Sequence, residues 1–311
     1  MKKRLSYLLL FIATIIWGLA FTAQKEASVL PVFTVGAMRS LFASLFLFAL
    51  IPILDKLTKS ERRLFGGKKI LDFNKNELIG GSILGVIITV ATTCQQYGLG
   101  DGTDAGKAAF ITALYVVIVP LLSLILGKKP SPLALISLPI AVFGFYILCI
   151  KPGAGFELSD LLVLLCAIIF AAHIITVDRF SPKCDGTRIS FIQFFVSFVL
   201  NAILSVIIDG GCEMEKIYGV LPWLLFLGIG SSGIAYTLQI IGQKNSDPTV
   251  ASMILSMEAV FGAIGSAIFL NERMQTREYV GCIVVFVAVM LAQIDISFIK
   301  NLFKKRGKNN E

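Results

Sequence analysis

The sequence predicts an all-α protein that crosses a membrane ten times, with its helices arranged as two inverted repeats of five. Composition supports this fold class first. The 311 residues are 56% hydrophobic and 15% charged, whereas soluble domains are about 45–50% apolar and about 25% charged. The apolar residues also form long blocks, and the two halves of the chain resemble each other. Block length and internal repetition then determine the number of helices and their arrangement.

Ten apolar blocks come close to the length of roughly 20 residues that a transmembrane helix needs. The first block follows Met1-Lys2-Lys3-Arg4, which is also how a signal peptide begins. Its apolar run is long for a signal peptide, and no clear A-x-A cleavage site follows it, so we expect it to remain as the first helix. The ten predicted spans are approximately 5–23, 32–54, 78–99, 104–127, 132–150, 158–177, 188–208, 219–242, 248–270 and 279–298.

An internal repeat predicts how these spans are arranged. Residues 84–130 align with residues 227–273 without a gap, so that Gln96 falls on Gln239 and Asp104 falls on Asp247. Five spans per unit is an odd number, so the second unit must be inverted relative to the first. Inverted repeats are typical of secondary transporters, whose substrate site lies between the repeats near the bilayer midplane. Membrane transport is therefore the leading hypothesis, with the two units at 5–150 and 158–296.

Basic residues predict the orientation. With a cytoplasmic N-terminus, 21 of the 28 Lys and Arg residues fall in cytoplasmic segments and 6 in outer ones. Cytoplasmic loops carry an excess of Lys and Arg, so we expect both termini and the loop 55–77 to be cytoplasmic, in a multi-pass protein of the plasma membrane. The net charge of +8 then reflects topology, and a nucleic-acid partner is not expected.

No cofactor or metal is expected. The six cysteines form no C-x-x-C pair and the chain has one histidine, which is a poor basis for a metal site. The sequence contains no G-x-x-x-x-G-K-[ST] phosphate loop. Uphill transport would therefore draw on an ion gradient, with protons as one candidate, or on the gradient of the solute. The sequence leaves the oligomeric state open.

Three ionisable residues within the predicted spans are candidates for function, because charges in hydrocarbon are costly. Desolvation favours a neutral carboxyl group, so Glu258 can exchange protons near neutral pH, bind a substrate ammonium group, or serve as a structural hydrogen-bonding group. Arg39 can bind a substrate carboxylate, pair with a protein carboxylate, or extend to the outer headgroups. His173 can relay protons or donate to a backbone carbonyl. Lys107, near an outer end, is expected to extend to the headgroups.

Aromatic and amide side chains form a second candidate set. Trp17 and Phe21 share one helix face because they are four residues apart. Tyr115 is the first-half counterpart of Glu258 at the repeat offset of 143 residues. Ordinary helix packing with interhelical hydrogen bonds is the alternative for each residue alone. As a group, we expect a central cavity between the repeats lined by Trp17, Phe21, Tyr115, Gln193, Tyr236 and Gln239, with Gln95, Gln96 and Tyr97 nearby.

Several of these residues lie in motifs that resemble the EamA-type branch of the drug/metabolite transporter superfamily. Trp17-Gly18-x-x-Phe21 is similar to the family's W-G-x-x-F, and Arg39 matches the arginine of the second helix. Met257-Glu258-Ala259-Val260 resembles L-E-P-V, with alanine in place of proline. In the fourth helix, residues 109–122 follow the family pattern, although Tyr115-Val116 stands where T-P is common. Near the end of the ninth helix, Leu270-Asn271-Glu272-Arg273 resembles a terminal G-E-R motif, with asparagine in place of glycine.

The resemblance covers nearly the whole chain in two units. It implies a ten-helix permease rather than an enzyme, working by alternating access and often exporting amino acids, related metabolites or toxic amphiphiles. It also implies a central cavity lined mainly by helices other than the fifth and the tenth, with the small-molecule solute and the lipid bilayer as partners.

Two other function classes are weighed against transport. Gly230-Ser231-Ser232-Gly233 contains the G-x-S-G of rhomboid-type intramembrane proteases. The histidine partner follows the serine in those enzymes, whereas His173 precedes it here, so helix packing explains the stretch better. A non-transporting membrane sensor or assembly protein is the third class, and the short loops argue against it.

Overall fold

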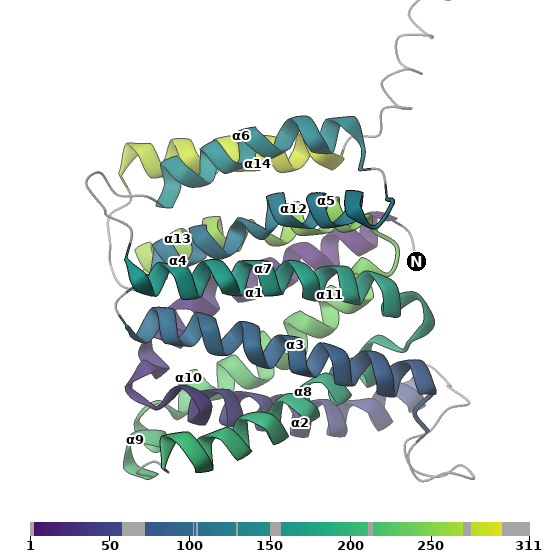
Figure 1. The fold of residues 1–311 in the computed structure, drawn as a ribbon, viewed down its shortest axis with the longest axis vertical. Helices are drawn as coiled ribbons and strands as arrows, with labels where there is room; N and C mark the ends of the chain where they lie inside the picture. The colour runs from purple at the N-terminus through teal and green to yellow at the C-terminus, as the bar shows by residue number, and fades with distance from the viewer. Residues whose placement is uncertain are drawn as a thin grey trace, which may run out of the picture.

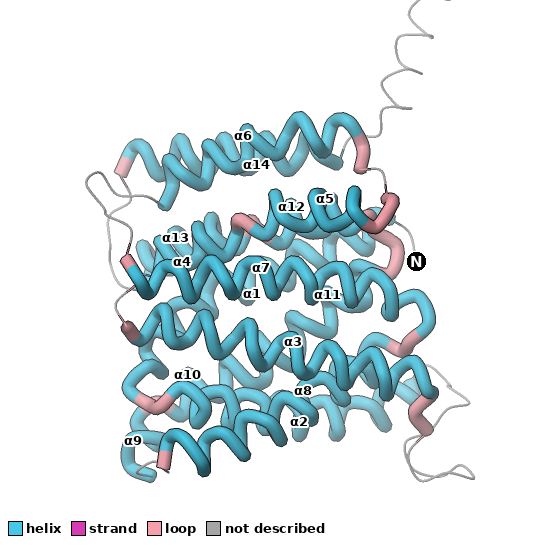
Figure 2. The backbone as a smooth tube through the Cα atoms, in the orientation of Figure 1, coloured by secondary structure: helices cyan, strands magenta, loops and turns pink. Residues whose placement is uncertain are grey.

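The computed structural model describes residues 3–57, 72–101, 103, 105–128, 130–149, 157–210, 214–269 and 275–293. Within these ranges the structure is helical and contains no strand, which confirms the predicted all-α class (Figure 2). The longer helices are α1 (Lys3–Glu26), α2 (Val32–Leu57), α3 (Lys75–Gly100), α4 (Ala105–Ala113), α5 (Tyr115–Ile125), α6 (Pro132–Cys149), α7 (Leu158–Phe180), α8 (Gly186–Leu204), α11 (Tyr236–Gln243), α12 (Pro248–Leu255), α13 (Glu258–Phe269) and α14 (Thr276–Gln293). Shorter helical pieces are η1 (Ala27–Val29), η2 (Ser181–Lys183), η3 (Ser205–Asp209), α9 (Met214–Gly219), α10 (Leu221–Leu225) and η4 (Phe226–Ala235).

Eight helical segments among the described residues are long and apolar enough to cross a membrane. The predicted spans 132–150 and 279–298 correspond to two shorter apolar helices, Pro132–Ile147 and Tyr279–Ala292. The predicted spans 104–127 and 248–270 are each broken into two helices, which the sequence analysis did not anticipate. The motif at 270–273, most of the loop 55–77 and the C-terminal basic residues lie outside the described residues.

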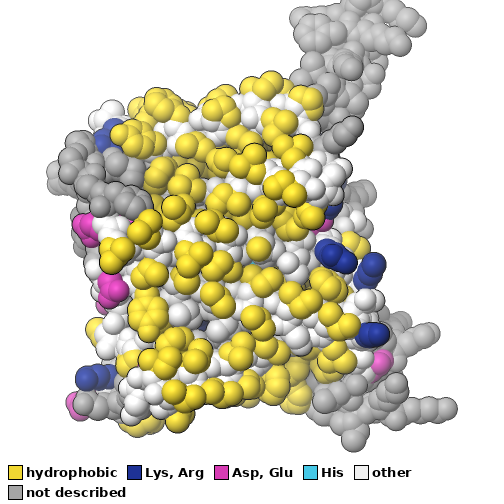
Figure 3. Space-filling view, in the orientation of Figure 1, with side chains coloured by type: hydrophobic (Ala, Val, Ile, Leu, Met, Phe, Trp, Pro, Cys, Tyr) yellow, Lys and Arg dark blue, Asp and Glu magenta, His cyan; other side chains and the backbone are white. Residues whose placement is uncertain are grey.

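The surface is that of a membrane protein. Figure 3 shows apolar side chains across the middle of one face, with charged side chains towards its left and right edges. Large apolar side chains that are more than a third exposed occur on almost every long helix, for example Leu45, Ile83, Phe143, Ile203 and Ile283. In water such an apolar surface would be unfavourable, whereas hydrocarbon accommodates it.

Polar caps fix where several helices begin. The Asn74 side chain accepts a hydrogen bond from the Glu77 amide (2.8 Å), and the Glu77 carboxylate accepts one from the Asn74 amide (2.9 Å) at the start of α3. Asp185 accepts from the Thr187 and Arg188 amides to begin α8. These side chains satisfy N–H groups that have no partner within the helix. At the same end of the bundle, Arg188 forms a buried ion pair with Asp55 (2.8 Å), which joins α8 to α2.

The helices pack in a consistent pattern. α2 lies along α8, α3 lies along both α7 and α8, and α1 contacts α11 and α13. α6 and α14 pack on each other at one extreme of the molecule, and α2 and α8 lie at the other (Figure 1). Gly81 and Gly85 bring α3 close to α8, since a Cβ at these positions would lie 2.6 Å from Ile192 Cβ and 2.7 Å from the Gln193 carbonyl oxygen. The Gly81-x-x-x-Gly85 spacing places both glycines on the same face of α3, as in other closely packed membrane helices.

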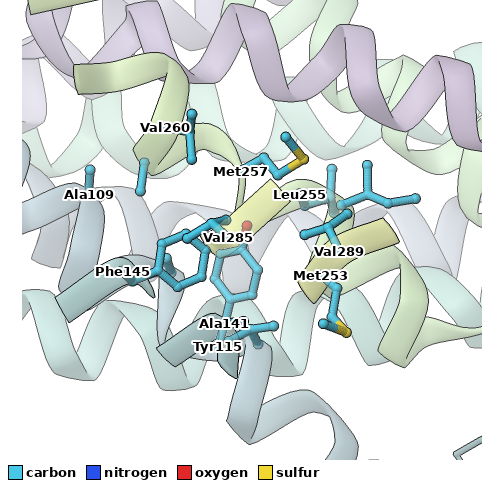
Figure 4. Close-up of a cluster of buried hydrophobic side chains, with 14 of the residues drawn as sticks. Ala109, Tyr115, Ala141, Phe145, Met253, Leu255, Met257, Val260, Val285 and Val289 are labelled. Atoms are coloured by element: carbon cyan, nitrogen blue, oxygen red, sulfur yellow. The ribbon is translucent and has the colours of Figure 1, made fainter. Parts of the chain in front are cut away.

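The largest apolar core lies between the broken helices and the α6–α14 pair. Its residues come mainly from α4, α5, α6, α12, α13 and α14, with others from α1, α3 and α7, and its Phe145 is fully buried (Figure 4). Tyr115 of α5 and Val260 of α13 both belong to this core, so the second half of each broken helix packs against it.

Candidate functional site

Two helix breaks lie at corresponding positions in the two halves of the chain. At the first, the Leu114 amide donates to Ile111, three residues back (3.2 Å), between α4 and α5. At the second, the Met257 amide donates to Ile254 and the Ala259 amide to Ser256 (both 3.2 Å), between α12 and α13. α5 begins with Tyr115 and α13 begins with Glu258, the two residues related by the repeat offset. Each break therefore places one of these predicted site residues at a new helix start.

A central cavity lies beside both breaks. Its volume is about 30 Å³. In this conformation the cavity thus has room for water but not for a metabolite. Its lining residues are Trp17, Ala20, Phe21, Gln24, Arg39, Gln95, Thr112, Tyr115, Phe170, Ile174, Ser231, Tyr236, Gln239, Leu255 and Glu258. None of these lining residues belongs to α6 or α14, which correspond to the predicted fifth and tenth spans. The resemblance implied that these two helices contribute little to the cavity.

Seven of the nine predicted site residues line this cavity, and two lie behind its wall. His173 and Gln193 are fully buried and contact each other, with His173 Nε2 3.1 Å from Gln193 Oε1. The His173 ring meets the Tyr236 ring edge to face at 5.6 Å. The Tyr236 ring in turn lies 4.5 Å from that of Trp17, whose indole N–H donates to the Ser231 carbonyl (3.1 Å). The two buried polar residues therefore support an aromatic wall of the cavity.

Arg39 is buried and held by neutral groups. Its guanidinium donates to Ser232 Oγ (3.1 Å), Gln24 Oε1 (3.4 Å) and Ser231 Oγ (3.4 Å). The side chain is 5% exposed and forms no ion pair with a residue that the structure describes. Two of the three roles considered for Arg39 therefore do not apply to this structure. The side chain neither pairs with a described protein carboxylate nor extends to the outer headgroups. The guanidinium of Arg39 instead lines the cavity, where its hydrogen bonds of 3.1–3.4 Å go to neutral groups and leave its charge available to an anion.

Glu258 and Tyr115 lie next to each other in the lining of the cavity. Both side chains are at most 5% exposed, and they lie within interaction range. Nevertheless, Glu258 Oε1 and the Tyr115 hydroxyl have no hydrogen-bond partner of good geometry within the protein, and Gln239 Oε1 is likewise unpaired. Buried polar atoms are normally paired. These three atoms leave the cavity able to bind water or a polar solute.

Some lining residues were missed or misread in the sequence. Gln24 lies on the helix face that carries Trp17 and Phe21, and following that face for one more turn would have found it. Ser231 was interpreted as a packing residue but is a partner of Arg39. Thr112 and Phe170 carried no distinguishing signal. Lys107 was expected to reach the headgroups, whereas it pairs with the fully buried Asp160 at 2.6 Å, because a partner carboxylate on α7 lies within reach.

The chain is similar to known transporters along nearly its whole length. It is 29% identical over 298 residues to an uncharacterized transporter of Archaeoglobus fulgidus, covering 95% of this chain and 88% of the relative. An uncharacterized transporter of Methanothermobacter thermautotrophicus is 24% identical over 304 residues, covering 94% and 87%. A solved structure titled only as a crystal structure of a protein has the same fold, with a TM-score of 0.72, 17% identity, and coverage of 93% of this chain and 96% of that one.

The sequence pattern of the EamA-like transporter family matches twice, at residues 4–150 and 157–293. Together the two matches cover most of the chain, and they agree with the motifs from which the resemblance was inferred. The apolar helices and the transporter relatives make this a multi-pass membrane protein that carries a small-molecule solute. The chain belongs to the EamA-like transporter family, within the drug/metabolite transporter superfamily.

Proposed function

We propose that the protein exports amino acids or closely related zwitterions across the plasma membrane by alternating access. The observation that carries this proposal is the charge content of one cavity. Arg39 and Glu258 both line it, both are buried, and neither forms an ion pair with a described residue. A buried charge without a partner is costly. A zwitterionic solute offsets both costs at once.

Each end of such a solute has a matching group. A carboxylate accepts two parallel hydrogen bonds from a guanidinium, which is the strongest geometry available to Arg39. The unpaired Glu258 Oε1 accepts from an ammonium group, with the Tyr115 hydroxyl and Gln239 Oε1 beside it. The remaining wall is apolar and aromatic, with Trp17, Phe21, Phe170, Ile174 and Leu255. This wall favours an apolar side chain on the solute.

Ten transmembrane helices in two inverted repeats are the architecture that we propose around this cavity. The two helix breaks are related by the repeat offset, and the two family matches divide the chain near the boundary between 5–150 and 158–296. Helix contacts also exchange between halves: α1 contacts α13 as α7 contacts α5, and α1 contacts α11 as α7 contacts α3. A pseudo-twofold relation between the halves accounts for these paired contacts.

Alternating access supplies the widening that so small a cavity requires. A metabolite cannot enter the small space seen here, so helices must separate first towards one membrane face and then towards the other. Broken helices are suited to this movement, because their short i to i+3 bonds bend more readily than a continuous helix. We propose export rather than import because the motifs resemble those of EamA-type transporters, which are often exporters.

Solute analogues test the proposal. Purified protein in proteoliposomes is offered radiolabelled L-leucine, L-phenylalanine and L-alanine, together with their N-acetyl derivatives, which lack the ammonium group, and their amides, which lack the carboxylate. We expect flux of at least one zwitterion and much less of either derivative. Glu258→Gln should reduce zwitterion flux by about ten- to a hundredfold, since hydrogen bonds to charged groups contribute about 1.5–3 kcal/mol.

The two charge variants should lose different discrimination. Glu258→Gln should stop distinguishing the zwitterion from its N-acetyl derivative, whereas Arg39→Gln should stop distinguishing it from its amide. Equal flux of zwitterions and both derivatives in the wild-type protein would contradict a dipolar binding site. Thr22→Val, which alters a buried α1 side chain outside the cavity lining, is the control for nonspecific damage.

A further inference from the structure

The hydroxyl of Thr14 connects α1 to the break between α12 and α13. Thr14 is fully buried, and its Oγ1 donates to the Ile254 carbonyl at 3.1 Å and lies 3.5 Å from the Leu255 carbonyl. These are the last two residues of α12, and Glu258 begins α13 three residues after Leu255. Thr14 itself does not line the cavity. It therefore touches the backbone that carries Glu258 rather than the solute space.

The Ile254 carbonyl also accepts from the Met257 amide at 3.2 Å, whereas the Leu255 carbonyl has lost its regular partner. In a continuous helix the Leu255 carbonyl would accept from the Ala259 amide, four residues later. At this break the Ala259 amide donates to Ser256 instead. A carbonyl left unpaired in hydrocarbon costs free energy. A hydroxyl from a neighbouring helix stabilises the broken form relative to a straight helix.

In its acceptors Thr14 differs from three other buried threonines within the helices, which bond to the backbone of their own helix. The hydroxyls of Thr89, Thr92 and Thr237 donate to the carbonyl four residues back in their own helix, at 2.7–2.8 Å. That is the usual arrangement for a threonine inside a helix. The Thr14 hydroxyl instead reaches residues about 240 positions away in the sequence.

Gly18, one turn further along α1, fixes the same contact. A Cβ at Gly18 would lie 2.4 Å from Phe261 Cβ and 2.8 Å from the Gly262 amide nitrogen, so the α1 backbone packs directly on α13. Thr14 and Gly18 are on one face because they are four residues apart. One face of α1 thus makes two contacts. The Thr14 hydroxyl contacts the end of α12, and the backbone at Gly18 packs on the first turns of α13.

We propose that Thr14 is a positioning residue, which holds the α12–α13 break open and thereby sets the location of Glu258 in the cavity. The effect on transport rests on the proposed function. The effect of Thr14 on the helix break does not rest on the proposed function, so the structural role and the effect on transport can be contradicted separately.

Hydrogen exchange tests the structural part without any solute. In nanodiscs, Thr14→Val replaces the hydroxyl by a methyl group of similar size, whereas Thr14→Ser keeps the donor. We expect amide exchange in the segment 256–261 to change by about tenfold in Thr14→Val, in line with the loss of one hydrogen bond. Thr14→Ser and the same-helix control Thr22→Val should match the wild type. Unchanged exchange in Thr14→Val would overturn the proposal whatever happens to transport.

A double-mutant cycle tests the link to Glu258. The readout is flux of a radiolabelled mixture of L-amino acids, with Thr14→Val, Glu258→Gln and the double variant. If Thr14 acts by placing Glu258, Thr14→Val should reduce flux about tenfold in the wild-type background and have little further effect in Glu258→Gln. Effects that multiply would overturn the positioning role and leave a packing role. If Glu258→Gln alone leaves flux unchanged while exchange still responds to Thr14→Val, the proposed function fails and the structural role of Thr14 stands.

Should Thr14→Val fail to reach the membrane, the inference remains open to test through Thr14→Ser and Thr14→Cys. Both side chains fit the site, and the thiol is a much weaker donor than the hydroxyl. Normal behaviour of both variants would contradict the need for a hydroxyl donor, whereas normal Thr14→Ser with altered exchange in Thr14→Cys supports it.

Discussion

Among individual residues, Glu258 is the one that should govern how transport responds to pH. It is the single carboxyl group in the described lining of the cavity, and His173 lies behind that lining. Protonation removes the negative charge that attracts an ammonium group, so flux at equal pH on both sides should fall as the solution is acidified. In Glu258→Gln the flux should be low and independent of pH, because the titrating group is gone.

His173→Gln provides the contrast. An amide keeps a hydrogen bond to Gln193 but cannot titrate, so this variant should retain the wild-type pH dependence even if its rate is reduced. The measurement is initial flux of the radiolabelled amino acids in proteoliposomes from pH 5 to pH 8, the range in which an ordinary histidine changes charge. If flux became independent of pH in His173→Gln but kept the wild-type pH dependence in Glu258→Gln, the titrating residue would be His173 and the assignment to Glu258 would be wrong.

At the level of elements, the contact between α3 and α8 depends on glycine. Gly81→Ala would place a Cβ 2.6 Å from Ile192 Cβ, whereas Gly100→Ala, in the same helix, meets nothing within 4 Å. Overpacking of this kind costs typically about 1–3 kcal/mol. We expect a lower thermal unfolding midpoint in Gly81→Ala, and an unchanged or slightly higher one in Gly100→Ala, since alanine favours a helix. Equal midpoints in detergent would show that α8 shifts freely to make room.

The elements also show where sequence reasoning reached its limit. Apolar blocks identified the helices, because hydrocarbon allows few alternatives to a helix. The breaks at Leu114 and at Ser256-Met257 carry no proline or glycine and so gave no local signal. The second is stabilised by Thr14, about 240 residues away. Likewise, the role of Ser231 depends on Arg39, which lies on another helix. Features created by distant contacts cannot be read from a local pattern, whereas Trp17, Phe21 and Glu258 could be, because polar or aromatic groups in a span are informative alone.

For the whole molecule, the basic residues predict an orientation that labelling can check. Glu26 and Asn245 are exposed; Glu26 is the last residue of α1, and Asn245 lies in the turn between α11 and α12. In intact cells an impermeant maleimide should label Glu26→Cys, at the predicted outer end of α1. Asn245→Cys, between α11 and α12, should react only after the membrane is opened. Both are compared with the unsubstituted protein, which has cysteines of its own. The opposite labelling pattern would invert the topology, and with it the direction of export.

The placement of the partners of Arg39 also constrains how the protein is made. A translocon inserts an arginine at the centre of a helix at a cost of about 2.5–3.5 kcal/mol. Of the hydrogen-bond partners of Arg39, Gln24 has already been translated when α2 enters the membrane, but Ser231 and Ser232 lie 192 and 193 residues further along the chain. At about 5–20 residues per second, the ribosome needs on the order of 10–40 seconds to reach them. During that interval α2 carries an incompletely solvated charge. In a nascent chain that ends before η4, Arg39 keeps this incompletely solvated charge. The unfinished protein therefore differs physically from the finished one in a way that membrane quality-control proteases can recognise.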